Sequence, residues 1–199
     1  MNRIKQTTEY NGINLLSSSG ESVASSGQFI EEITRRDTYG MTTLVSVDES
    51  ISLTSGTYSI STADELSKLA AMTNNGLIGE NTEFVLANDI DLSAYSTGEG
   101  WTPIGTSNQF TATFDGNGYV ISNLYINTPS INCVGLFRWC NFAEIKNVGL
   151  ENVDVTGDYE VGGLMGRGCD VTISNSYVTG SVSGTGNVGG LIGYGYFPY

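Results

Sequence analysis

The chain has 199 residues and a formal net charge of −13, and it contains no histidine. A strong negative charge repels phosphate backbones, so nucleic acid is not expected as a partner. The lack of histidine excludes imidazole-based triads and most transition-metal sites, and no apolar run is long enough to predict a membrane span. With 26 Gly, 3 Pro and few long helical runs, the composition favours an all-β fold with many turns.

Residues 1–50 are predicted to form a small amino-terminal appendage. The stretch "NRIKQTTEYNGINLLSSSG" (2–20) resembles the point in bacterial flagellins where the amino-terminal coiled helix ends. The residues that carry this resemblance are Arg3, Ile4, Thr8, Glu9, Tyr10, Asn11, Gly12, Leu15 and Leu16. The long assembly helices of flagellins are absent, so the resemblance implies the outer, variable part of a flagellin or a fragment of one. Residues 17–26 are rich in Ser and Gly and are expected to be a linker.

Two local elements are predicted at the start of the main domain, 51–199. The stretch "ISLTSGTYSI" (51–60) predicts a hairpin that turns at Ser55-Gly56. In "STADELSKLAAMTNNG", Thr62 as N-cap and Glu65 form a capping box, which predicts a helix from 62 to about 74. This helix is expected to cover the open end of the domain with Leu66 and Leu69.

Two motifs recur with a common period in the second half of the chain. "VGLF", "VGGLMG" and "VGGLIG" begin 27 residues apart, at Val134, Val161 and Val188. "ISNLYI", "IKNVGL" and "ISNSYV" begin 24 and 28 residues apart, at Ile121, Ile145 and Ile173. Interleaved motifs with a shared period indicate one unit stacked on its copies. They predict a right-handed parallel β-helix, or solenoid, over residues 51–199.

The recurrent residues are expected to occupy equivalent places in successive coils. The three valines and the three isoleucines should each stack with their side chains inward. The glycine pairs are expected to allow either a positive φ or a close approach to a neighbouring coil; they are Gly162, Gly163, Gly189 and Gly190. Asn123, Asn147 and Asn175 are expected to hydrogen-bond one another across coils and to cap turns.

A second resemblance covers residues 58–193. "TADELSKLA", "FVLANDIDL", "WTPIG", "FDGNGYVISNLYI", "VGLF" and the two "VGGL" copies, in this order, resemble bacterial surface proteins that carry GLUG repeats. In that family the repeats belong to large secreted or wall-attached proteins, which are often adhesin-like, and the repeats are thought to form β-solenoids. No catalytic residues come with the motif. The resemblance implies an extracellular location, at a bacterial cell surface or flagellum.

Several polar groups are candidates for ligand sites. Asp89, Asp91, Asp115 and Asn117 lie in predicted turns, and turn formation is favoured for them over calcium binding. No cofactor is expected. Cys133, Cys140 and Cys169 are expected to be buried thiols, with a Cys133–Cys140 or Cys140–Cys169 bridge as the weaker alternative.

A catalytic site is not expected, although β-helices host carbohydrate-active enzymes. Arg138 and Arg167 are predicted to lie near each other on successive coils, but no carboxylate has a catalytic spacing. The candidates are Glu144, Glu151, Asp154, Asp158 and Glu160. The terminal aromatics Tyr194, Tyr196, Phe197 and Tyr199 are expected to stack on sugars or a partner, or to cover the last coil.

These features favour a non-enzymatic, surface-exposed structural module of a bacterial filament, in contact with other filament subunits. A module that binds a host glycan or protein is the alternative, and a carbohydrate-active enzyme is the weakest hypothesis.

Overall fold

A computed structural model of the chain describes residues 9–10, 13–14, 34–36, 42–44 and 52–196. The chain divides into two compact units, Met1–Ile33 and Thr34–Tyr199. In the first unit, β1 (Glu9–Tyr10) and β2 (Ile13–Asn14) pair antiparallel. The rest of the flagellin-like stretch and the linker 17–26 lie outside the described residues, as do the terminal aromatics Phe197 and Tyr199.

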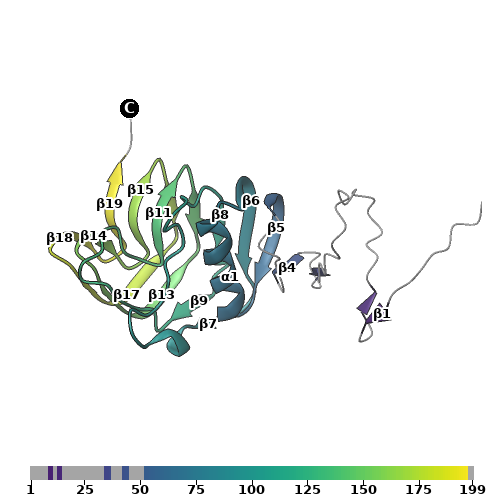
Figure 1. The fold of residues 1–199 in the computed structure, drawn as a ribbon, viewed down its shortest axis with the longest axis horizontal. Helices are drawn as coiled ribbons and strands as arrows, with labels where there is room; N and C mark the ends of the chain where they lie inside the picture. Colours follow the sequence, from purple (N-terminus) through teal and green to yellow (C-terminus); the bar gives the residue numbers. More distant parts are fainter. Residues whose placement is uncertain (1–8, 11–12, 15–33, 37–41, 45–51, 197–199) are drawn as a thin grey trace, which may run out of the picture. The chain divides into compact units, whose positions relative to one another are not determined.

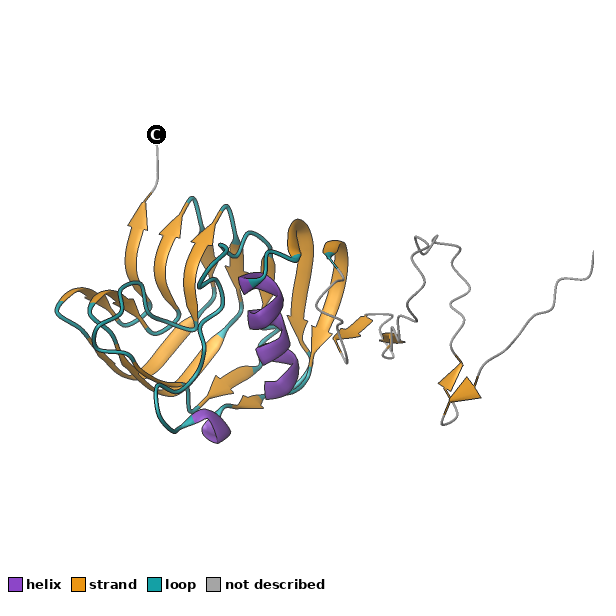
Figure 2. Cartoon of the chain, in the orientation of Figure 1, coloured by secondary structure: helices purple, strands orange, loops and turns teal. Residues whose placement is uncertain are grey.

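The second unit is a stack of coils whose strands form four faces, and all strand pairs between coils are parallel (Figures 1 and 2). The first face consists of β5 (Leu53–Ile60), β6 (Ile78–Leu86), β8 (Thr113–Asp115), β12 (Glu144–Lys146) and β16 (Thr172–Ser174). The second consists of β7 (Ile90–Asp91), β9 (Val120–Ser122), β10 (Tyr125–Asn127), β13 (Gly149–Thr156) and β17 (Tyr177–Ser183).

Two narrower faces complete each coil. The third consists of β14 (Tyr159–Gly162) and β18 (Gly186–Gly189), and the fourth of β11 (Phe137–Asn141), β15 (Met165–Cys169) and β19 (Ile192–Tyr196). We call residues 78–112, 113–143, 144–171 and 172–196 coils 1 to 4. The structure is therefore all-β with stacked parallel sheets, as expected for a parallel β-solenoid, plus one α-helix; its right-handedness stays a prediction.

The first face also extends toward the amino terminus. β4 (Thr42–Leu44) pairs parallel with β5, and β3 (Thr34–Arg36) pairs antiparallel with β4. By its internal contacts, the compact unit that contains the coils begins at Thr34, and the predicted domain boundary at residue 51 stays a prediction.

The interior of the stack is one continuous hydrophobic core. Its largest side chains are four phenylalanines with no exposed surface, namely Phe84, Phe110, Phe114 and Phe137. Their rings lie next to one another, with centroids 5.0 Å apart for Phe110 and Phe137 and 5.3 Å apart for Phe114 and Phe137. Burial of a phenylalanine side chain stabilises a fold by about 1.5–3 kcal/mol, so this cluster is a main source of stability in coils 1 and 2.

The predicted helix is confirmed as α1 (Ala63–Asn74). The Glu65 N–H donates to Thr62 Oγ1 at 3.2 Å, and the Glu65 carboxylate accepts from the N–H of Ser61 at 2.6 Å. Leu66 and Leu69 have no exposed surface. At the other end, Asn74 Oδ1 accepts from the backbone N–H groups of 105 and 106, at 2.8 and 2.7 Å. α1 therefore packs on coil 1 (Figure 2). It covers the part of coil 1 that β5, which lies on the first face only, leaves without a neighbouring strand.

The predicted hairpin at Ser55-Gly56 is wrong. β5 runs through both residues as one strand and pairs parallel with β6. The parallel register arises because α1 connects β5 to β6, as in a βαβ unit. Ser and Gly are common in turns, which is why the local sequence predicts one here. In the structure, Ser55 and Gly56 instead pair with Asn81 and Thr82 of the neighbouring strand.

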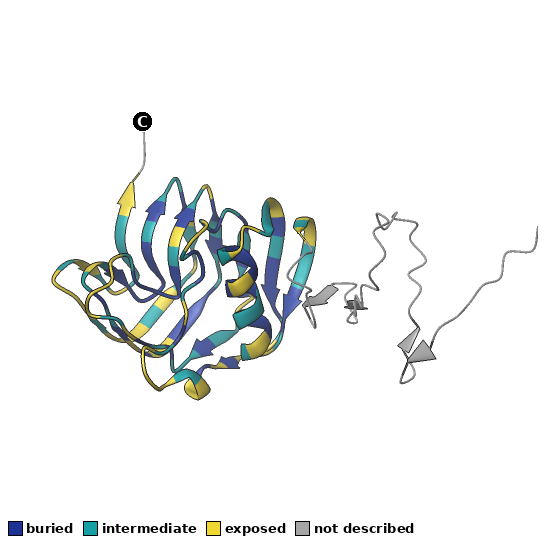
Figure 3. Ribbon diagram, viewed as in Figure 1, coloured by how far each residue is buried: buried dark blue, intermediate teal, exposed yellow. Residues whose placement is uncertain are grey.

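Burial changes along the stack (Figure 3). Coil 3 has a strongly buried interior, with Val161 and Leu164 at 0% exposure. In coil 4 the strands β17 and β18 contain only intermediate and exposed residues, and Val188 is 44% exposed. In the part of the chain that the structure describes, the apolar side chains of coil 4 have a neighbouring coil on one side only.

Candidate functional site

The three repeated valines stack directly on one another. Val134 is bridged in parallel to Val161, and Val161 is paired with Val188. Val134 and Val161 point into the core, with 1% and 0% exposure. Val188 occupies the same place in coil 4, where no further coil of the described residues covers it and it is 44% exposed.

The three repeated isoleucines do not share one place, which corrects the prediction for Ile121. Ile145 pairs with Ile173 on the first face, as expected. Ile121 lies on the second face, in β9, where it pairs with Leu150. The motif Ile-x-Asn is used at two different bends of the coil, and its sequence alone does not distinguish them.

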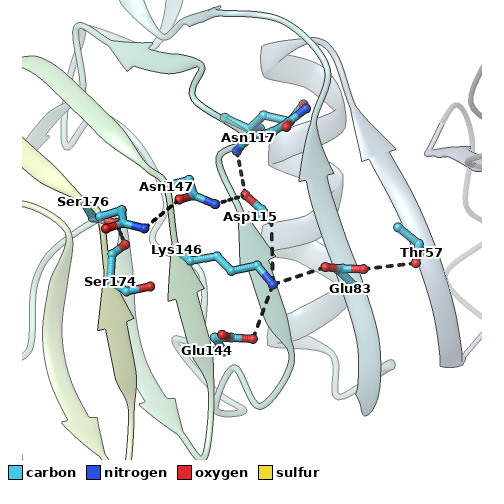
Figure 4. A network of polar contacts seen from close by, with 11 residues as sticks. Thr57, Glu83, Asp115, Asn117, Glu144, Lys146, Asn147, Ser174 and Ser176 are labelled. Carbon is cyan, nitrogen blue, oxygen red and sulfur yellow. Dashed lines mark hydrogen bonds and ion pairs between the residues drawn. The ribbon is translucent and has the colours of Figure 1, made fainter.

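At each of the two bends, polar side chains of successive coils form a row of hydrogen bonds, which we call a ladder. In the first, Asn175 Nδ2 donates to Asn147 Oδ1 at 3.2 Å, and Asn147 Nδ2 donates to Asp115 Oδ1 at 2.9 Å (Figure 4). In the second, Asn152 donates to Asn123 at 2.6 Å, and Asn123 donates to Asp91 at 2.8 Å. The Asn147–Asn175 hydrogen bond was predicted, whereas Asn123 belongs to the other ladder.

Three of the four repeated glycines act through close approach rather than through a positive φ, whereas a Cβ on Gly190 would meet no atom within 4 Å. Gly162, Gly163, Gly189 and Gly190 are all absent from the positive-φ residues of the described chain. A Cβ on Gly162 would collide with the carbonyl oxygen of Met165, and a Cβ on Gly163 would lie 2.6 Å from the carbonyl oxygen of Gly190. The corner between the third and fourth faces is therefore too tight for a side chain.

The acidic turns use their oxygens within the protein. Asp91 accepts from the N–H and hydroxyl of Ser93 as well as from Asn123. The hydrogen bond from Asn123, followed by those from Ser93, holds the pKa of Asp91 below its usual value. Asp89 accepts from the N–H of Val120 at 2.8 Å. Among the described residues, no three His, Cys, Asp or Glu side chains are arranged to hold a metal ion.

A lysine on the first face is surrounded by carboxylates (Figure 4). Lys146 Nζ lies 3.6 Å from Glu83, 3.8 Å from Asp115 and 3.5 Å from Glu144. Burial of the amine opposes its charge, but the three carboxylates together raise the pKa of Lys146. The amine therefore stays protonated at neutral pH and does not act as a general base there.

Of the four remaining acidic candidates, three have separate polar partners. Glu151 accepts from the Tyr177 hydroxyl at 2.8 Å, and Asp158 accepts from the Thr185 hydroxyl. Glu160 lies 3.7 Å from Arg167. Asp154 is exposed, and among the described residues its side chain makes no hydrogen bond or ion pair. The structure brings none of these four carboxylates together as a pair.

A column of large side chains crosses the fourth face. The register pairs Trp139 with Arg167, and Arg167 with Tyr194. The Arg167 guanidinium lies 5.4 Å from the indole centroid and 5.5 Å from the Tyr194 centroid, so it stacks between the two rings. The sequence pointed to Arg167 and Tyr194 as candidates but not to Trp139. Arg138 was expected beside Arg167, and the residue that pairs with Arg167 is the next one along the chain, Trp139.

All three cysteines are free thiols, so both alternative bridges are wrong. Cys140 is fully buried, and Cys133 and Cys169 are partly buried. Cys133 Sγ donates to the Glu160 carboxylate at 3.0 Å. Burial, followed by this hydrogen bond and the charge of Glu160, raises the pKa of Cys133 to about 11.

Trp139 also borders a shallow depression of about 430 Å³. Its other walls are the carboxyl end of α1 with the residues that follow it up to Ile78, and the segment 107–111 of coil 1. Every lining residue is uncharged, and most carry hydroxyl or amide groups. This depression combines an aromatic ring with neutral hydrogen-bonding groups, and no sequence motif pointed to it.

The chain is similar to short parts of two much longer proteins. It is 38% identical over 140 residues to halomucin from Haloquadratum walsbyi, which covers 65% of this chain and 2% of halomucin. It is 41% identical over 85 residues to a putative Gly-rich membrane protein from Evansella cellulosilytica, which covers 41% of this chain and 9% of that protein. No protein-family profile and no solved structure match the chain, and nothing in these comparisons indicates a flagellin. Among the described residues, no helix is long and apolar enough to cross a membrane.

Proposed function

We propose that residues 52–196 form a rigid, non-enzymatic structural module displayed at a cell surface as part of a longer protein. The observation that carries this proposal is the continuous register between coils, in which Val134, Val161 and Val188 stack and the asparagines form ladders. A stack of this kind gains its stability from neighbouring coils and presents long, regular faces. The similarity to short parts of very long proteins, one of them described as a membrane protein, supports the same function.

Surface display is tested with antibodies raised against the purified module. We expect them to label intact cells that express the gene, and brief protease treatment of those cells to remove the signal. An antibody against a cytosolic protein serves as the control for cell integrity. Labelling that appears only after permeabilisation would overturn the proposal.

A finer proposal is that the module belongs to a flagellar filament. It is supported by the resemblance of residues 2–20 alone, since the rest of the chain carries no flagellin motif. If it holds, filaments sheared from the cells contain the protein. If the protein stays with the sheared cells while the antibodies label their surface, the adhesin alternative replaces the filament.

The absence of enzymatic activity is part of the proposal and has its own test. The purified module is incubated with acidic and neutral polysaccharides, with and without calcium, and reducing ends and unsaturated products are followed. We expect no turnover, because Glu83, Asp115 and Glu144 are paired with Lys146, which stays protonated. Turnover that is abolished by Glu144→Gln or Glu160→Gln would establish an enzyme instead.

A further inference from the structure

The depression beside Trp139 lies where three parts of the fold meet. Thr73 comes from the carboxyl end of α1, segment 107–111 from coil 1, and Trp139 from coil 2. Its volume of about 430 Å³ falls in the range of small-molecule sites, about 300–1,000 Å³. Because all three parts are tied together, by Asn74 to the backbone at 105 and 106 and by the core, the depression is preformed.

The indole of Trp139 is held in place from one side. Arg167 belongs to coil 3, and its guanidinium stacks over the Trp139 ring. The depression lies toward coil 1, on the other side of coil 2. Trp139 keeps 39% of its surface exposed, although an indole is normally favoured in a buried position. An aromatic ring that is fixed on one side and uncovered on the other offers a flat apolar surface to a ligand.

Most hydrogen-bonding side chains around the ring keep groups that the protein does not use; the exception is the Thr73 hydroxyl, which donates to the Leu69 carbonyl. Asn108 Nδ2 donates one hydrogen bond, to the Asn74 carbonyl at 2.8 Å, which fixes the amide and leaves its oxygen open. Within the described part of the chain, the side chains of Ser107, Gln109 and Thr111 make no hydrogen bond. An amide offers two donors and an acceptor, and a hydroxyl offers one donor and accepts as well. The depression therefore presents donors and acceptors together and carries no charge.

We propose that this depression binds a neutral saccharide, with the apolar face of a sugar ring on Trp139 and the sugar hydroxyls bonded to Gln109 and Asn108. A sugar ring has one face of C–H groups and a rim of hydroxyls that donate and accept, which is the complement of this surface. An anionic ligand does not fit, since no cation lines the site and the nearby Arg167 is paired with Glu160 at 3.7 Å. The net charge of −13 also repels anions. This binding goes beyond the structural role and is independent of it.

The binding is tested by following the two tryptophan indole N–H signals of the ¹⁵N-labelled module by nuclear magnetic resonance. Trp101 is 2% exposed and serves as an internal reference, whereas Trp139 should report on the site. The probes are the neutral oligosaccharides cellohexaose, maltohexaose and mannohexaose, with an oligogalacturonate as the anionic probe. We expect at least one neutral probe to shift the Trp139 signal with a Kd on the order of 1 mM, since one open site provides few contacts. The Trp101 signal should stay in place.

Two variants and a matched control separate binding from folding. Gln109→Ala should weaken binding roughly fivefold, as expected for the loss of one hydrogen bond. Trp139→Ala removes the indole signal itself, so its binding is followed through the backbone amide signals of residues 107–111, which should shift with the neutral probe in the unchanged module and not in this variant. Phe142→Ala removes an aromatic that is 68% exposed but does not line the depression, and it should leave Kd unchanged. An unchanged Trp101 signal in each variant shows that the fold is retained. No shift of Trp139 with any neutral probe, a shift only with oligogalacturonate, or a Kd unaffected by Gln109→Ala would overturn the proposal. None of these outcomes bears on surface display.

Discussion

At the scale of the residue, asparagine allows the coil to bend sharply. Among the described residues, ten that are not glycine have a positive φ, and six of these are asparagines. Asparagine tolerates this conformation better than most residues because its short amide bonds locally. Asn147 has a φ of 54° and also forms the middle of the first ladder. One side chain thus fixes both the bend and the register between coils.

Replacing Asn147 separates these two effects. Asn147→Gly keeps the conformation and loses two hydrogen bonds, which we expect to cost about 1–2 kcal/mol of unfolding free energy. Asn147→Ala loses the same bonds and adds the strain of a positive φ, so it should cost about 1 kcal/mol more. Urea denaturation of the two variants measures the difference. Equal stabilities would show that the backbone relaxes and that the φ of this residue is not a constraint.

The thiol of Cys133 gives a second prediction at this scale. Its pKa of about 11 keeps it protonated at pH 8, where a free cysteine with a pKa near 8.5 is partly ionised. Because the thiolate is the reactive form, Cys133 should be alkylated by iodoacetamide more slowly in the folded than in the unfolded chain. Glu160→Gln removes the nearby charge, so it should lower this pKa and speed the reaction. Peptide mass mapping distinguishes Cys133 from the other two cysteines, and equal rates in both proteins would contradict the role of Glu160.

The raised pKa of the Cys133 thiol also determines whether its contribution to the stability of the fold rises or falls with pH. A group whose pKa is higher in the folded than in the unfolded state stabilises the fold below the unfolded pKa. The contribution of Cys133 is therefore complete below about pH 8.5 and is lost as the pH rises toward 11.

At the scale of the element, the sequence predicted those helices and strand contacts that depend on local caps or on the repeat period. The helix at Ala63–Asn74 followed from its cap, and the stacking of Val161 on Val188 followed from the period of 27. The direction of β5 did not follow, because it depends on pairing with β6 across α1. The depression at Trp139 was also missed, since its walls come from three segments that no single motif contains.

The cap of α1 can be tested directly. Thr62→Ala removes the oxygen that accepts from the Glu65 N–H, which should cost about 1 kcal/mol of unfolding free energy. Thr62→Ser retains that oxygen and serves as the matched control. The measurement is urea denaturation followed by circular dichroism. A loss of stability equal in the two variants would assign the effect to the methyl group rather than to the cap.

At the scale of the whole molecule, stability depends on the position of a residue within the stack. A coil with neighbours on both sides buries its inward side chains, whereas coil 4 has a neighbour on one side only in the described structure. Val161 and Val188 have the same side chain, the same motif and the same place in their coils, yet their exposed fractions are 0% and 44%. The repeat is therefore uniform in sequence and graded in burial.

This gradient predicts different costs for the same substitution. Val161→Asp places a carboxylate in an apolar interior that offers it no partner, so it should destabilise the module by several kcal/mol, on the order of 3–5. Val188→Asp leaves the carboxylate in contact with water and should cost about 1 kcal/mol or less. Urea denaturation of the two variants compares them, and Val161→Ala and Val188→Ala separate the loss of packing from the burial of charge. If Val188→Asp were as costly as Val161→Asp, coil 4 would be covered in solution, and the open end seen in the structure would be occupied by another copy or another segment.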